Sequence, residues 1–156
     1  MRIGFAIDSD CNSQFMYSVF EQTKYFIGDV LFFCERKGNS LLNYNICSFP
    51  IEDSFYFTQS PLIATSINTA KSILNNYSNT KKYLYLYDLE WYQKISKFNY
   101  DHFEKIYRNK DLEIIAENED FAKIFTRCWN RKPCAVIPKT NLNEIYRLYY
   151  GHSKSN

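Results

Sequence analysis

The chain has 156 residues, of which 46% are hydrophobic and 19% aromatic, so it is long enough to fold as one domain with a substantial core. Its 19 basic and 17 acidic residues nearly balance, which argues against a nucleic-acid partner. No apolar stretch is long enough for a membrane span, and the five cysteines and two histidines lack zinc-ligand spacing. We therefore expect no metal and reduced cysteines in a cytoplasm.

The first 35 residues predict one βαβ unit. Met1–Asp8, reading MRIGFAID, is expected to be a strand, and apolar residues then recur at helical spacing from Phe15 to Ile27. A second apolar strand follows at Asp29–Glu35. Neither GxGxxG nor GxxxxGK follows the first strand, and the chain has only four glycines. A dinucleotide cofactor or a P-loop is therefore not expected, and no other cofactor is assigned.

The middle of the chain is less regular. Leu41–Phe49 is a weak strand candidate, and Pro50–Pro61 has no clear pattern. Ile63–Ser66 is expected to be a short strand that delivers a helix with apolar residues at helical spacing. Either Ser66 or Asn68 can cap that helix, because a side-chain oxygen of either residue can accept from its first N–H groups.

Tyr83–Trp91, reading YLYLYDLEW, is an apolar run of strand length that ends in two carboxylates and an indole. The elements expected after it are a short helix around Phe103 capped by Asp101, a strand at Leu112–Ala116, a helix face from Phe121 to Trp129, a strand at Ala135–Ile137 and a helix from Leu142 to Tyr149. The residues expected to be buried are Ile3, Phe5, Ile7, Leu31, Phe33, Leu84, Leu86, Ile114 and Ile115. This alternation predicts a three-layer Rossmann-like α/β domain with a mainly parallel open sheet over residues 1–150, and a disordered tail over 151–156.

Polar or aromatic residues follow several predicted strands, at the edge where parallel sheets bind their ligands. These candidate ligand-binding residues are Asp8, Ser9, Asp10, Thr65, Ser66, Asp88, Glu90, Trp91, Glu117 and Asn118. No catalytic residue is assigned among them. The densest basic cluster, Arg127, Arg131 and Lys132, ends a predicted helix, where cations suit the helix dipole.

Three strings resemble the amino-terminal, acceptor-side domain of GT-B glycosyltransferases, especially bacteriophage-type members. They are IATSINTAKSIL at Ile63–Leu74, KKYLYLYDLEWY at Lys81–Tyr92, and LEIIAENEDFAKIFTRCWNRKPCAVIP at Leu112–Pro138. The resemblance covers roughly two thirds of the chain. It implies a Rossmann-like domain whose strand-end loops bind the acceptor, without the second domain that would hold the nucleotide-sugar donor.

Each candidate also has a structural interpretation. Asp8 and Asp10 either hydrogen-bond sugar hydroxyls or cap the next helix. Thr65 and Ser66 either bind an anion at a helix start or simply cap it. Asp88, Glu117 and Asn118 also suit a turn or a helix start, because Asp and Asn favour turns and caps and the dipole favours acidic groups. Trp91 either stacks on a ligand and forms an exposed patch for a partner, or packs in the core.

The resemblance implies a glycosyltransferase-related single-domain protein that is not catalytic alone, and that binds a sugar or acceptor or completes a split enzyme. The alternative is a noncatalytic interaction or virion-associated protein that uses the half-fold as a scaffold. A small independent enzyme on a flavodoxin-like fold is a third hypothesis, but no nucleophile–base pair supports it. The expected partners are a second copy or another protein chain, the expected ligand is a sugar or nucleotide sugar, and the expected location is a host cytoplasm or a virion.

Overall fold

A computed structural model describes residues 1–9, 14–36, 47–76, 80–94 and 100–152. Within these residues, seven strands form one open sheet in the order β3-β2-β1-β4-β5-β6-β7. The strands are β1 (Arg2–Ser9), β2 (Asp29–Arg36), β3 (Ser48–Pro50), β4 (Leu62–Ala64), β5 (Lys82–Leu86), β6 (Leu112–Ala116) and β7 (Ala135–Val136). Every neighbouring pair runs parallel.

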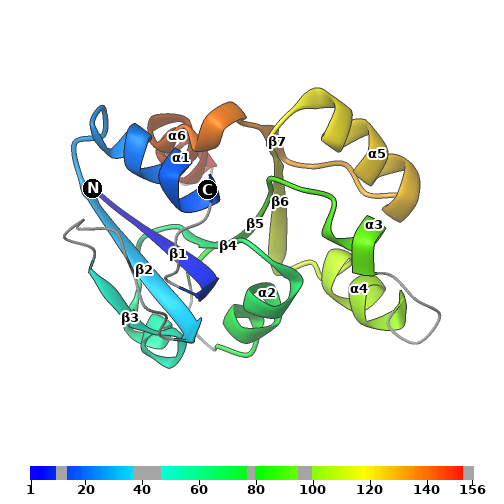
Figure 1. Ribbon diagram of the computed structural model, residues 1–156, viewed down its shortest axis with the longest axis horizontal. Coiled ribbons are helices and arrows are strands. Elements are labelled where there is room, and N and C mark those ends of the chain that lie inside the picture. Colours follow the sequence, from blue (N-terminus) through cyan, green and yellow to red (C-terminus); the bar gives the residue numbers. More distant parts are fainter. Residues whose placement is uncertain (10–13, 37–46, 77–79, 95–99, 153–156) are drawn as a thin grey trace.

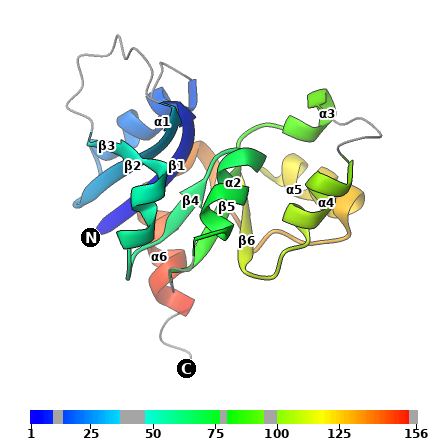
Figure 2. The ribbon, with the colours of Figure 1, turned by 90° about the horizontal axis from the view of Figure 1, so that it is seen from below.

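Helices cover both faces of the sheet (Figures 1 and 2). The α-helices are α1 (Gln14–Thr23), α2 (Ile67–Leu74), α3 (Glu90–Lys94), α4 (Tyr100–Tyr107), α5 (Glu119–Trp129) and α6 (Leu142–His152), and the short 3₁₀ helices are η1 (Ile51–Tyr56) and η2 (Pro138–Thr140). One core cluster contains buried residues of α1 and α6, and the other contains residues of α2, α4 and α5. The predicted three-layer Rossmann-like fold with a parallel sheet is therefore confirmed.

The order of the strands reverses beside β1. Ala6 of β1 pairs with Phe33 of β2 on one side and with Ala64 of β4 on the other. In open α/β sheets, ligands bind beyond the carboxyl ends of the strands, typically at such a reversal. We therefore expect a ligand-binding site at the carboxyl edge of the sheet.

Most of the predicted core is buried, since eight of the nine residues expected inside are buried and Leu31 is half-buried. The strand in YLYLYDLEW is shorter than expected, because it ends at Leu86 and the chain turns into α3 at Glu90. The predicted cap of α4 is wrong, because the helix begins at Tyr100 and Asp101 lies inside its first turn.

The less regular segments also differ from expectation. Of the weak strand candidate, Ser48–Pro50 forms β3, and residues 37–46 lie outside the described residues. The last helix ends at His152, so Gly151 is helical and does not belong to a disordered tail. Residues 153–156 lie outside the described part of the chain. No helix of the described residues is long and apolar enough to cross a membrane.

Candidate functional site

Two predicted site residues meet at the carboxyl ends of β1 and β4. The Ser66 hydroxyl donates to the Asp8 carboxylate at 2.9 Å, although 58 positions separate the two residues. Beside them the Thr65 hydroxyl donates to the Ala6 carbonyl at 3.1 Å. Parallel pairing of β1 with β4 brings these groups together, as the strand-end argument predicts.

Protein side chains bond the first N–H groups of α2. Ser66 is the N-cap and accepts from the Thr69 N–H at 3.2 Å, while the Thr69 hydroxyl accepts from the Ser66 N–H at 3.0 Å. Glu90 of α3 accepts from the Ile67 N–H at 2.9 Å. The capping interpretation of Ser66 is confirmed, and the Glu90 carboxylate occupies the position where a bound anion would sit.

We call this network the capped half of the carboxyl edge. Its members are Asp8, Thr65, Ser66, Thr69 and Glu90.

Among the other predicted candidates, Asp88 is exposed in the turn after β5. Asn118 is the N-cap of α5 and accepts from the Phe121 N–H at 2.8 Å, so its structural interpretation is confirmed. The side chain of Ser9 and the whole of Asp10 lie outside the described residues, so their roles remain predictions.

Trp91 belongs to the core. Its side chain is 3% exposed, and its ring meets those of Tyr107, Phe125 and Trp129 edge-on, with centroids 5.4, 5.8 and 6.0 Å away. The first turn of α3 directs the indole toward α4 and α5. The expectation that Trp91 forms an exposed patch on the cleft side is therefore wrong.

A cavity of about 340 Å³ opens at the same carboxyl edge, between α1, the ends of β5 and β6, and η2. We call it the edge cavity. Its lining residues are Gln14, Phe15, Ser18, Tyr87, Glu117, Lys139 and Thr140. Its volume lies near the lower end of the range for small-molecule sites, and its lining combines two aromatic rings with several hydrogen-bonding groups and one group of each charge.

Burial changes the acid–base properties of two lining groups. Burial raises the pKa of the Glu117 carboxyl above its ordinary value. Burial, assisted by the nearby acidic groups Asp88, Asp8 and Glu90, raises the pKa of Tyr87 to about 12. The Tyr87 hydroxyl therefore remains protonated at neutral pH and keeps its capacity to donate a hydrogen bond.

The η2 turn borders the cavity with an unusual backbone. Lys139 has φ 51° and ψ 33°, and the next residue, Thr140, also has φ 51°. A left-handed conformation costs a residue other than glycine about 1–2 kcal/mol, and a β-branched threonine is rare there. Neither position holds a glycine or an asparagine, so the residue types do not indicate a left-handed turn here.

The hydroxyl groups of Tyr85 and Ser18, which lie on other elements, hydrogen-bond to this turn and stabilise it. The buried Tyr85 hydroxyl donates to the Ile137 carbonyl at 2.7 Å and accepts from the Thr140 N–H at 3.0 Å. The Ser18 oxygen of α1 lies 3.3 Å from the Thr140 hydroxyl oxygen and donates to the Lys139 carbonyl at 3.4 Å. Because β5 and α1 both hold the turn, the wall of the cavity is built by the fold itself.

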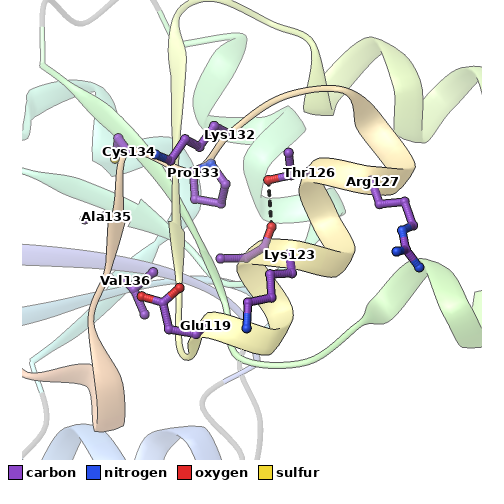
Figure 3. Close-up of a pocket in the computed structure, with 10 residues that line it drawn as sticks. Glu119, Lys123, Thr126, Arg127, Lys132, Pro133, Cys134, Ala135 and Val136 are labelled. Atoms are coloured by element: carbon purple, nitrogen blue, oxygen red, sulfur yellow. Dashed lines mark hydrogen bonds between the residues drawn. The ribbon is translucent and has the colours of Figure 1, made fainter.

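A second hollow, of about 680 Å³, lies between α5 and the edge strand β7 (Figure 3). We call it the α5–β7 groove. Small side chains, Ala122, Pro133, Ala135 and Val136, make up its apolar part. Its charged lining residues are Glu119, Lys123, Arg127 and Lys132, and it also contains Thr126 and the exposed Cys134.

The predicted basic cluster is divided between two roles. Arg127 and Lys132 line the α5–β7 groove. Arg131 donates to the carbonyls of Tyr107 at 2.8 Å and Asn109 at 2.7 Å, and also to the Leu112 carbonyl. The helix end that Arg131 complements is therefore that of α4 rather than α5.

The sequence patterns predicted one residue of the edge cavity, Glu117, and missed the others. Tyr87 belongs to the YLYLYDLEW string and is the first residue after β5. This position at the carboxyl end of a strand is the sequence signal that indicates a site residue. Pro138 directly precedes Lys139 and Thr140, and proline favours turns, so it is the sequence signal that indicates a turn at this wall of the cavity.

No protein-family model, curated protein or solved structure matches this chain. Among the described residues, no group of three or more His, Cys, Asp or Glu side chains could hold a metal ion. The fold and the site therefore define the architectural class of the protein and no particular family. The chain is a Rossmann-like α/β protein with a ligand-sized, polar and aromatic cavity at the carboxyl edge of its sheet.

Proposed function

We propose that this chain is a glycosyltransferase-related domain that binds a sugar, or a sugar-bearing acceptor, in the edge cavity. The observation that carries the proposal is the position and lining of that cavity at the carboxyl ends of β5 and β6. Two strings that resemble GT-B acceptor-side domains contribute Tyr87 and Glu117 to it. Lys139 follows directly after the end of the second of these strings.

The lining suits the chemistry of a sugar ring. A sugar presents hydroxyl groups around its rim and C–H groups on its faces. The rings of Phe15 and Tyr87, with centroids 5.0 Å apart, offer apolar surface for those faces. The Glu117 carboxyl and the Gln14 amide offer hydrogen-bond acceptors and donors for the hydroxyls.

In this proposal the chain does not transfer sugar by itself. Transfer needs a donor and an acceptor held in alignment, because alignment converts a bimolecular reaction into an effectively unimolecular one. The edge cavity is large enough for one small ligand only. We assign the acceptor to this cavity and the nucleotide-sugar donor to another domain or another polypeptide.

The test is direct binding by the purified chain. Ligand-observed NMR and calorimetry with glucose, galactose, N-acetylglucosamine and UDP-glucose are expected to show saturable binding of at least one sugar. Glu117→Ala should weaken that binding by roughly 10-fold to 100-fold, the equivalent of one hydrogen bond to a charged group. Glu113→Ala is the matched control, because Glu113 lies on β6, the strand that ends just before Glu117, is half-buried and is absent from the cavity lining. Absence of any sugar binding, or equal losses in both variants, would contradict the proposal.

The α5–β7 groove favours the alternative function, a noncatalytic interaction protein. It is the larger hollow, it borders an edge strand, and Arg127 and Lys132 give it a positive rim that suits acidic side chains of a partner protein. Under this alternative, Lys132→Glu abolishes association with such a partner, and Glu117→Ala leaves it unchanged. Light scattering and pull-down with both variants distinguish the two functions.

A further inference from the structure

The η2 turn differs from the end of α5 in the residue types that adopt left-handed backbone. At the end of α5 the left-handed C-cap is Asn130, a residue type that adopts this conformation at low cost. In the η2 turn the two left-handed residues are Lys139 and Thr140, which adopt it at a higher cost. Strained backbone of this kind persists where the surrounding structure enforces it, and it is concentrated at functional sites.

The contacts of the two residues separate their roles. Thr140 is buried, its N–H donates to Tyr85, and its hydroxyl lies beside Ser18, so its side chain and backbone hold the fold together. Lys139 is exposed, and only its backbone carbonyl takes part in a hydrogen bond that the structure shows. Within the described residues, nothing in the fold uses the Lys139 ammonium group.

The charge of Lys139 also has no ion-pair partner among the described residues that line the cavity. Glu117 is the one carboxylate among the described lining residues, and no ion pair joins it to Lys139. Burial raises the pKa of Glu117, whereas a cation in contact would lower it. Glu117 therefore does not neutralise Lys139, the cationic residue of the described lining.

We propose that Lys139 binds an anionic substituent of the ligand, so that the ligand of the edge cavity is a sugar carrying a phosphate or a carboxylate group. The hydrogen-bonded η2 turn holds the Lys139 backbone at the wall of the cavity, within reach of an anionic group bound there. The sugar part of this inference rests on the proposed function, whereas the anion contact rests on the η2 turn alone.

Binding of four probes to the purified chain tests the inference. Glucose supplies the neutral ring, glucose 6-phosphate and glucuronate supply the two anionic forms, and inorganic phosphate supplies the anion alone. We expect one of the two anionic sugars to bind at least about tenfold more tightly than glucose, the usual advantage of one charge-assisted contact. Lys139→Gln should abolish that preference, because it removes the charge and keeps a polar side chain of similar length.

A second variant tests whether the left-handed backbone at Lys139 is tolerated because the Lys139 side chain binds the ligand. Lys139→Gly relieves the left-handed strain, so it should also abolish the preference while its melting temperature stays equal to or above that of the wild type. Gln59→Gly is the matched control, because Gln59 has φ 59°, is exposed and lies outside the cavity lining. Gln59→Gly carries the same gain in unfolded-chain entropy, and the preference for the anionic sugar should survive in it.

The outcomes separate this inference from the proposed function. Equal binding of glucose and both anionic sugars, or a preference that survives Lys139→Gln, overturns the inference and leaves the proposed function standing. Phosphate binding that depends on Lys139, without binding of any sugar, supports the anion contact and overturns the proposed function. Absence of binding by all four probes overturns the inference, and it overturns the proposed function as well when galactose, N-acetylglucosamine and UDP-glucose also fail to bind. A melting temperature of Lys139→Gly well below that of Gln59→Gly would show that the Lys139 side chain supports the fold, which also overturns the inference.

Discussion

The capped half and the edge cavity lie on the same edge of the sheet but use their polar groups in opposite ways. In the capped half, Ser66 bonds Asp8 and Thr69, and Glu90 bonds the start of α2. In the edge cavity, Glu117 and Lys139 line an open space and form no ion pair with each other. Hydrogen bonds within the protein therefore stabilise the first region, whereas the second leaves polar groups available to a ligand.

This difference moves the candidate site along the sheet. The strand reversal lies between β1 and β4, where the general rule for open α/β sheets expects the ligand. In this chain the Glu90 carboxylate already occupies the α2 end of that region. The cavity opens instead by β5 and β6, next to the α1 helix. A ligand phosphate that sought the start of α2 would first have to displace Glu90.

The largest expected effect comes from Trp91, the residue next to Glu90 that belongs to neither region. Trp91→Ala should lower the free energy of unfolding by about 3–5 kcal/mol, because it empties a buried site among three aromatic rings. Urea denaturation provides the measurement. The exposed neighbour Tyr92 is the control, and Tyr92→Ala should change stability by less than about 0.5 kcal/mol. Similar stability for both variants would place the indole outside the core.

Tyr85→Phe should destabilise the wall of the edge cavity. It removes a hydroxyl that serves both the Ile137 carbonyl and the Thr140 N–H, and leaves buried groups without partners, at a cost of about 1–3 kcal/mol. We also expect weaker ligand binding, because the η2 turn loses its restraint.

Tyr83→Phe is the matched control on the same strand. The Tyr83 hydroxyl is buried without a hydrogen-bond partner among the described residues, so its removal should be neutral or stabilising. Thermal melting and sugar titration of both variants provide the comparison. If Tyr83→Phe proved as costly as Tyr85→Phe, the pinning role of the Tyr85 hydroxyl would have no support.

Ser66→Ala tests whether the side-chain hydrogen bonds of the capped half serve stability rather than ligand binding. The variant should lose about 1 kcal/mol of stability, the typical value of an N-cap, and should leave ligand binding in the edge cavity unchanged. Asn68→Ala is the control, because Asn68 was the other cap that the sequence allowed and the structure shows it exposed inside α2. Its stability should remain within about 0.5 kcal/mol of the wild type. A drop in sugar affinity for Ser66→Ala would show that the two regions are coupled.

Local patterns predicted the elements whose signals lie within a few residues. The apolar strands, the cap at Asn118 and the choice of Ser66 or Asn68 all follow from neighbouring residue types. Patterns could not show that Glu90 would reach back to Ile67, because that bond depends on how α3 folds onto α2. The same limit applies to Arg131, whose partners Tyr107 and Asn109 lie on the preceding loop and helix.

The edge cavity was harder to predict for a physical reason. Residues distant in sequence form it, and its wall depends on a turn that lacks the residues normally used for left-handed backbone. Tyr85 stabilises that turn from 55 positions away, so no local rule identifies it. The sequence around Trp91 predicts a ligand platform or a core residue equally well, because an indole after a strand suits both, and only the packing of α3 decides between them.

The smallest expected effect is a pH dependence that involves Glu117. Burial raises the pKa of its carboxyl in the folded chain above the value near 4.5, so the folded state holds the proton more tightly than the unfolded state. Stability therefore falls as the pH rises from about 4.5 through the raised pKa, and the loss is complete above that pKa. Glu117→Gln lacks this titration. Its free energy of unfolding minus that of the wild type should therefore increase from about pH 4 to about pH 8 and then become constant, as followed by urea denaturation across that range. A difference in the free energy of unfolding that stayed the same at every pH would show that the Glu117 carboxyl is as well solvated in the folded chain as in the unfolded chain. The edge cavity would then solvate this carboxyl as well as an exposed surface does.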